Sequence, residues 1–191
     1  MRKHVLFIHG AGKGAYDEDR RLATSLQSAL GAGYDVQCPR MPDEENAPFD
    51  AWKAEIETRL AVLDGEVLLV GHSVGASILL KWLSQSRSAY GIAGLFLIAA
   101  PYWGGDEGWH YAGYEQLELP RDVAVKLNGR WPIFFYHSRD DEIVPFGHLA
   151  LYAATLPRAT IRAFDGREHQ FKNDLTDVAE DIKETWRDAP A

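Results

Sequence analysis

The sequence predicts an α/β fold in which helices cover both faces of one mostly parallel sheet. Six short apolar segments alternate with segments in which apolar residues recur every three or four positions. The apolar segments are typical of strands that are buried on both faces, as in a parallel sheet. This alternation, in a chain of 191 residues without repeats or an internal linker, predicts a single three-layer α/β/α domain over residues 1–191.

The first strand is predicted over His4–Ile8 and leads into a glycine-rich turn, His9–Gly14. In the next helix Asp17 is the expected N-cap, because an aspartate side chain can accept a hydrogen bond from a free N–H of the first turn. Glycine favours helix ends, so this helix should end at Gly31 or Gly33. Its apolar stripe consists of Leu22, Leu26 and Leu30.

The second strand is predicted over Tyr34–Cys38, and the following stretch, Arg40–Pro48, is expected to form a loop. A helix is predicted over Phe49–Leu63, because its apolar residues are spaced four apart. These residues are Trp52, Ile56 and Leu60. The third strand, Glu66–Val70, is followed after a short glycine-containing turn by a helix that starts at Val74.

Three more strands are predicted in the second half of the chain, over Ala93–Ala100, Pro132–His137 and Ala159–Phe164. A helix begins near Pro145, and a closing helix carries Leu175, Val178, Ile182 and Trp186. Residues 102–131 do not follow this alternation, and many of them are aromatic.

The composition narrows the classes of partner. A formal charge of −8 disfavours nucleic acid or an anionic membrane as the main partner. The single cysteine, Cys38, cannot form an intramolecular disulfide, and no apolar stretch is long enough for a membrane span or a signal peptide. We therefore expect a cytoplasmic protein without a membrane partner. The sequence sets no oligomeric state.

The turn after the third strand carries the strongest chemical signal. Residues Gly71-His72-Ser73-Val74-Gly75 form a G-x-S-x-G pattern between a strand and a helix. In this arrangement a sharp, strained turn exposes the serine hydroxyl beside the N–H groups of a helix N-terminus. Ser73 is therefore the candidate nucleophile.

A serine nucleophile needs a base and a carboxylate that orients the base. In such sheets the acid follows the serine in the chain, and the histidine follows the acid. Asp141, after the fifth strand, is the preferred acid, with Asp140 as the alternative. Either aspartate could instead cap the following turn. His169, after the last strand, is the expected base.

The oxyanion of the reaction is expected to bind two backbone N–H groups. One belongs to Val74, which follows the nucleophile, and the other to Ala11, with Gly12 as the alternative. The glycines of the first turn lack the spacing of a phosphate-binding loop. No spacing of cysteine and histidine matches a zinc site, so neither a metal nor another cofactor is predicted.

Aromatic residues follow the fourth strand, at the edge where the candidate catalytic residues gather. They are either a packed loop or the wall of a substrate pocket. We favour the pocket, with Gly12, Tyr102, Trp103 and Trp109 as lining residues.

Four segments of the chain, VLFIHGAGKG, LLVGHSVGAS, SRDDEIVP and REHQF, resemble the short serine hydrolases of the retinoblastoma-binding protein 9 and YdeN type, within the α/β-hydrolase superfamily. The resemblance implies the sheet order 2-1-3-4-5-6 and no large cap domain. It also implies Ser73 as nucleophile, Asp141 as acid and His169 as base. The L-x-C-x-E segment that is associated with retinoblastoma-protein binding is absent around Cys38, so that partner is not implied.

The sequence therefore predicts a serine hydrolase that cleaves small carboxylic esters or thioesters through an acyl-enzyme. An amidase or aminopeptidase-like hydrolase is the alternative among enzymes. A hydrolase fold that serves only as a protein-interaction module is the alternative outside them.

Overall fold

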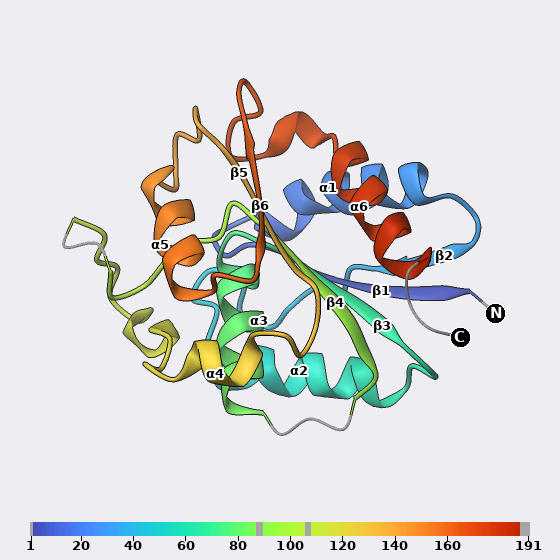
Figure 1. The fold of residues 1–191 in the computed structure, drawn as a ribbon, viewed down its shortest axis with the longest axis horizontal. Coiled ribbons are helices and arrows are strands. Elements are labelled where there is room, and N and C mark those ends of the chain that lie inside the picture. The colour runs from blue at the N-terminus through green and yellow to red at the C-terminus, as the bar shows by residue number, and fades with distance from the viewer. Residues whose placement is uncertain (1, 87–89, 106–107, 188–191) are drawn as a thin grey trace.

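The computed structural model describes residues 2–86, 90–105 and 108–187. Its centre is a six-stranded sheet with the order β2-β1-β3-β4-β5-β6, in which every neighbouring pair is parallel (Figure 1). The strands are β1 (Lys3–Ile8), β2 (Tyr34–Gln37), β3 (Val67–His72), β4 (Ile92–Ile98), β5 (Ile133–Ser138) and β6 (Thr160–Phe164). The predicted parallel sheet and its order are confirmed.

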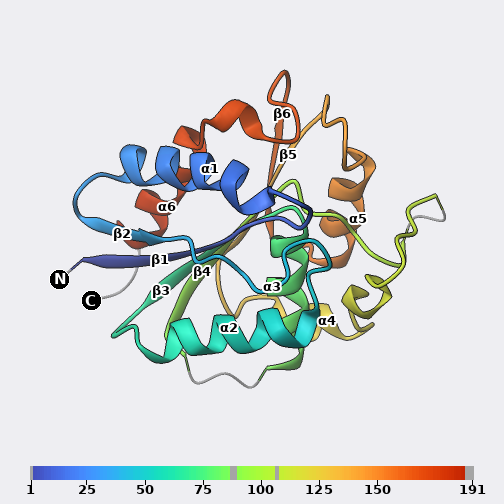
Figure 2. The same cartoon turned by 180° about the vertical axis from the view of Figure 1, so that it is seen from behind.

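Helices cover both faces of the sheet. They are α1 (Ala15–Leu30), α2 (Phe49–Ala61), α3 (Val74–Gln85), α4 (Val123–Leu127), α5 (Gly147–Thr155) and α6 (Thr176–Arg187). Helices α1 and α6 lie on one face, and α2, α3 and α4 lie on the other, as the front and back views show (Figures 1 and 2). Two short 3₁₀ turns, Glu115–Leu117 and Phe171–Asn173, complete the described elements.

The four central strands are mostly apolar and buried, because each of their faces meets a helical layer, whereas the edge strands β2 and β6 contain polar residues and are only partly buried. In β1, Val5 and Phe7 belong to the core shared with α1 and α6, whereas Leu6 and Ile8 belong to the core shared with α2, α3 and α5. All four side chains are fully buried. Burial of this kind contributes about 1.5–3 kcal/mol for each large aliphatic or aromatic side chain, so the two cores hold the sheet rigid under the loops that leave it.

Two local expectations need revision. The prediction that Asp17 caps the first helix is wrong, because α1 begins at Ala15, directly after Gly14, whose φ of 86° lets the chain turn into the helix. Asp17 lies in the first turn and forms an ion pair with Arg40 at 3.2 Å. The segment that lacked a pattern in the sequence contains both Glu115–Leu117 and α4. None of the described helices combines the length and the apolar character that a membrane crossing requires.

Candidate active site

Ser73 occupies a strained turn between β3 and α3. Its backbone has φ 51° and ψ −126°, in a region that residues with a Cβ rarely adopt. The turn is possible because its flanking glycines are closely packed: a Cβ at Gly71 would lie 2.6 Å from the Cα of Ala76. The sharp turn predicted for the G-x-S-x-G segment is confirmed, and Ser73 stands at the N-terminal end of α3.

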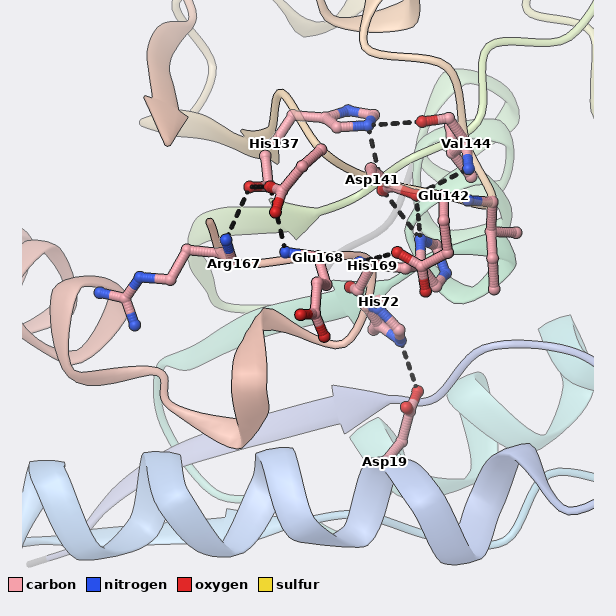
Figure 3. Close-up of polar contacts among 12 residues, drawn as sticks. Asp19, His72, His137, Asp141, Glu142, Val144, Arg167, Glu168 and His169 are labelled. Carbon is pink, nitrogen blue, oxygen red and sulfur yellow. Dashed lines mark hydrogen bonds and ion pairs between the residues drawn. The ribbon is translucent and has the colours of Figure 1, made fainter. Parts of the chain in front are cut away.

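His169 and Asp141 meet at the carboxyl end of the sheet, although they are 28 positions apart in the sequence (Figure 3). Nδ1 of His169 lies 2.9 Å and 3.0 Å from the two carboxylate oxygens of Asp141. An ionised carboxylate only accepts hydrogen bonds, so Nδ1 carries the proton and Nε2 is the basic nitrogen of the neutral ring. Nε2 makes no hydrogen bond to any described residue.

The carboxylate of Asp141 is held from several sides at once. Its side chain is fully buried, its Oδ1 accepts hydrogen bonds from the backbone N–H groups of Ile143 and Val144, and Nε2 of His137 lies 3.2 Å from Oδ2. Burial opposes ionisation, but hydrogen bonds from His137 and His169 outweigh it and hold the pKa of Asp141 well below its ordinary value. Asp141 therefore both closes its own turn and holds His169.

Asp140, the alternative acid, does not contact the ring of His169. Its carboxylate accepts hydrogen bonds from the hydroxyl of Ser138 and from the backbone N–H of Glu168. These contacts connect the loop after β5 to the loop that carries His169. The structure thus brings Asp141 rather than Asp140 against the imidazole.

The loop that carries His169 is fixed against the turn at Ser73. The backbone N–H of His169 donates to the carboxylate of Glu142 at 3.0 Å, and its carbonyl oxygen lies 3.1 Å from Nε2 of His72. The rings of His72 and His169 lie 4.8 Å apart. Burial lowers the pKa of His169 below the ordinary 6.5, against the opposing hydrogen bond to Asp141. His169 is therefore neutral and able to accept a proton at neutral pH.

Two backbone N–H groups beside Ser73 are available as oxyanion donors. Val74 is the first residue of α3, so its N–H has no acceptor within the helix. The N–H of Ala11 has no acceptor among the described residues, whereas the N–H of Gly12 donates to the carbonyl oxygen of Glu44 at 2.7 Å. Of the two N–H groups considered in the first turn, that of Ala11 is the free one.

A pocket of about 180 Å³ opens beside Ser73. It is lined by Ala11, Gly12, Ser73, Val74, Pro101, Trp103, Trp109, Tyr111, Tyr114, Ile143 and Val144. Of the four lining residues that we predicted, Gly12, Trp103 and Trp109 lie on this wall. Tyr111 and Tyr114 also line it, and sequence reasoning missed them although they belong to the same aromatic segment.

Tyr102 lies elsewhere. Its hydroxyl is 2.9 Å from Oγ1 of Thr155, and its ring packs edge-on against Tyr152, both on α5. Trp103 therefore lines the pocket, whereas its neighbour Tyr102 packs against α5.

The aromatic wall presents two unsatisfied donors. The indole nitrogens of Trp103 and Trp109 are buried and have no hydrogen-bond partner among the described residues. The ring of Trp103 is stacked on Tyr114, with their centroids 5.0 Å apart. A buried donor without an acceptor costs about 1–3 kcal/mol, so these two indoles are a local cost to the stability of the aromatic wall.

A buried carboxylate that sequence reasoning missed lies beneath the site. Asp19, on α1, is 2.8 Å from Nδ1 of His72 (Figure 3). It also accepts a hydrogen bond from the backbone N–H of Gly10. Among the described residues, no group of three or more histidine, cysteine, aspartate or glutamate side chains is arranged to hold a metal ion.

Comparison with known proteins gives a family match. A model of the alpha/beta hydrolase family matches residues 5–191. No curated protein matches the chain by sequence.

Solved structures resemble the whole chain. The ydeN gene product from B. subtilis is 17% identical with a TM-score of 0.71, and the match covers 97% of this chain and 99% of that one. The meta-cleavage product hydrolase from Pseudomonas fluorescens IP01 (18%, TM-score 0.74, 98% and 92% covered) and Est1E from Butyrivibrio proteoclasticus (17%, TM-score 0.72, 97% and 87% covered) are also similar. At these identities the likeness shows the fold.

Proposed function

The chain belongs to the alpha/beta hydrolase family, and on that premise we propose that it is a serine hydrolase that cleaves small carboxylic esters or thioesters. The observation that carries the proposal is the contact between Asp141 and Nδ1 of His169, at 2.9 Å, in a loop whose backbone contacts His72, the neighbour of a serine in a strained turn. This contact places the proton of the neutral ring on Nδ1, so Nε2 can accept the proton of a serine hydroxyl.

The proposed reaction follows the usual two steps of acyl transfer. Nε2 of His169 takes the proton of Ser73 as Oγ attacks the carbonyl carbon, and Asp141 stabilises the imidazolium that forms. The negative oxygen binds the N–H groups of Val74 and Ala11, each of which stabilises the transition state by about 3–4 kcal/mol in comparable sites. His169 then protonates the leaving alcohol or thiol. Water, activated by the same imidazole, hydrolyses the acyl-enzyme.

The pocket suggests the size and chemistry of the acyl group. A cavity of about 150 Å³ can hold a benzene ring, so the pocket of about 180 Å³ beside Ser73 fits a short chain or one small ring. Its aromatic wall favours an apolar group.

A fluorophosphonate probe tests the nucleophile directly. We expect the probe to label the wild-type protein at Ser73 and to leave Ser73→Ala unlabelled. Ser84→Ala is the matched control, since Ser84 is a buried serine of the same helix whose hydroxyl donates to the carbonyl oxygen of Lys81. This variant should be labelled at the wild-type rate. A wild-type protein that takes no label would refute the proposed nucleophile and would favour an interaction module.

Matched substrates test the reaction class. A p-nitrophenyl ester and the p-nitroanilide with the same acyl group present the same pocket with different leaving groups. For an esterase, the ratio of kcat/KM on the ester to kcat/KM on the anilide should exceed the ratio of the two uncatalysed hydrolysis rates. A ratio that favours the anilide after this correction would identify the protein as an amidase instead.

A further inference from the structure

Asp19 connects three segments that form the candidate site. It lies on α1, and its residue is only 2% exposed. Oδ2 accepts the backbone N–H of Gly10 at 2.7 Å, in the turn that carries the proposed oxyanion donor. Oδ1 accepts the side-chain amide of Gln170 at 2.7 Å, next to the proposed base. The third contact is with His72, the residue before the proposed nucleophile.

Both ring nitrogens of His72 face acceptors. Nδ1 lies 2.8 Å from Oδ2 of Asp19, and Nε2 lies 3.1 Å from the carbonyl oxygen of His169 (Figure 3). A carbonyl oxygen can only accept a hydrogen bond, so Nε2 carries a proton. Asp19 already accepts hydrogen bonds from a backbone N–H and from an amide side chain, which favours its ionised form. Nδ1 must therefore also carry a proton.

We propose that His72 is an imidazolium in the folded protein at neutral pH, and that the ion pair of Asp19 and His72 positions the nucleophile turn, the oxyanion turn and the base loop relative to one another. The role of this ion pair in the reaction rests on the proposed function, because the pair acts through Ser73, Ala11 and His169. Asp19 and His72 are positioning residues, since neither of them is a proposed donor or acceptor of the reacting proton.

The charged groups around His72 are consistent with the pair. Burial alone would lower the pKa of His72, but the carboxylate of Asp19 raises it above the ordinary 6.5, with a smaller contribution from Asp141. Burial would raise the pKa of Asp19, but the charge and hydrogen bond of His72 lower it to about 2. His169 is the other titratable ring in contact, and the charge of His72 disfavours a second proton on it.

The stability that the pair of Asp19 and His72 contributes depends on pH. Because the pKa of His72 is raised in the folded state, its contribution to stability is complete below 6.5 and is lost as the pH rises through the folded pKa. Because the pKa of Asp19 is lowered to about 2 from 3.8, its contribution is present above 3.8 and is lost as the pH falls towards 2.

Nitrogen NMR of histidine side chains tests the charge without any turnover. In protein labelled with ¹⁵N-histidine and assigned through the backbone, both ring nitrogens of His72 should have the shifts of protonated nitrogen at pH 7. The ring of His169 should show one protonated and one unprotonated nitrogen at the same pH. An unprotonated nitrogen in His72 at pH 7 would refute the ion pair, whether or not the protein is an esterase.

Asp19→Asn tests the positioning role. An asparagine cannot accept all three hydrogen bonds, because one of its two polar atoms is a donor. Since a displacement of about 1 Å can cost about 100-fold in rate, we expect kcat on a short p-nitrophenyl ester to fall by about 10–100-fold, with less change in KM. The low-pH limb of kcat/KM should move to higher pH, because His169 loses a neighbouring positive charge.

Asp181→Asn is the matched control. Asp181 is a second buried carboxylate, 7% exposed, and it binds Arg162 and the hydroxyl of Tyr136 away from the site. This variant should lose stability while kcat and the pH profile stay as in the wild type below the unfolding transition. If Asp19→Asn also keeps its kcat within twofold and its pH profile unchanged, the positioning role is wrong. Absence of wild-type hydrolysis and labelling would count against the proposed function instead.

Discussion

Gly75 offers the most direct test of how the fold sets the position of Ser73. It is the second residue of α3, and it lies where this helix passes over the end of β1. A Cβ built at Gly75 would lie 2.5 Å from the carbonyl oxygen of Ile8, and closer still to that of His9. Both obstacles are backbone atoms, so no side-chain rotation can relieve the overlap.

The size of the effect follows from these distances. Ordinary contact with a Cβ begins at about 3.4 Å, so α3 and β1 would have to separate by about 1 Å in Gly75→Ala. Overpacking of this kind costs about 1–3 kcal/mol, and an obstacle made of backbone favours the upper end of this range. The same displacement moves Ser73 relative to the turn that carries Ala11, and about 1 Å of misplacement can cost about 100-fold in rate.

Urea unfolding and the rate of fluorophosphonate labelling measure the two consequences separately. We expect Gly75→Ala to lose about 3 kcal/mol in the free energy of unfolding and to label about 100-fold more slowly below the transition. Gly147→Ala is the control, because a Cβ at Gly147, the first residue of α5, meets no atom within 4 Å. It should change the free energy of unfolding by less than about 1 kcal/mol, in the stabilising direction, and leave the labelling rate unchanged. If Gly75→Ala behaves like this control, the close approach does not set the position of the nucleophile.

Three further predictions concern single side chains. Asp141→Asn should lower kcat by about 10⁴-fold, whereas Asp140→Asn, which leaves the contact with the imidazole intact, should change it by less than about tenfold; equal losses would contradict the assignment. The pKa of His169 is lowered by burial and only the neutral ring is a base, so kcat/KM should be half-maximal below pH 6.5, and a midpoint above that value would argue against His169. Burial raises the pKa of Cys38 to about 12, so iodoacetamide should modify this thiol at pH 7 only after unfolding in urea, as mass spectrometry can show.

The strands could be predicted because a parallel sheet buried on both faces leaves a continuous apolar signal. Strand ends were less well defined. The fourth strand was predicted over Ala93–Ala100, but β4 ends at Ile98, because Ala99 has a φ of 48° and leaves the sheet while staying fully buried. Apolar character reports burial, and burial continues beyond the last strand residue. Hydropathy alone therefore cannot locate this end.

Some residues of the candidate site could also be predicted from the sequence, and others could not. The structure brings Asp141 and His169 together at the sheet edge where their strands end, as the order of the chain suggested. Tyr102 was placed wrongly because composition shows that a loop is aromatic but does not show which side chain points into the pocket. That direction depends on backbone dihedrals in a segment without a regular period.

Asp19 is missing from the sequence-based site for a different reason, since it is 53 positions from His72 and belongs to no known spacing pattern. A signal was nevertheless present. Asp19 precedes Leu22, Ala23 and Leu26 by three, four and seven positions, so it lies on the buried stripe of its helix. A carboxylate on such a stripe must have partners, because an unpaired buried charge is too costly. The helical period therefore predicts that a partner for Asp19 exists, and the identity of that partner depends on how α1 packs against the end of β3.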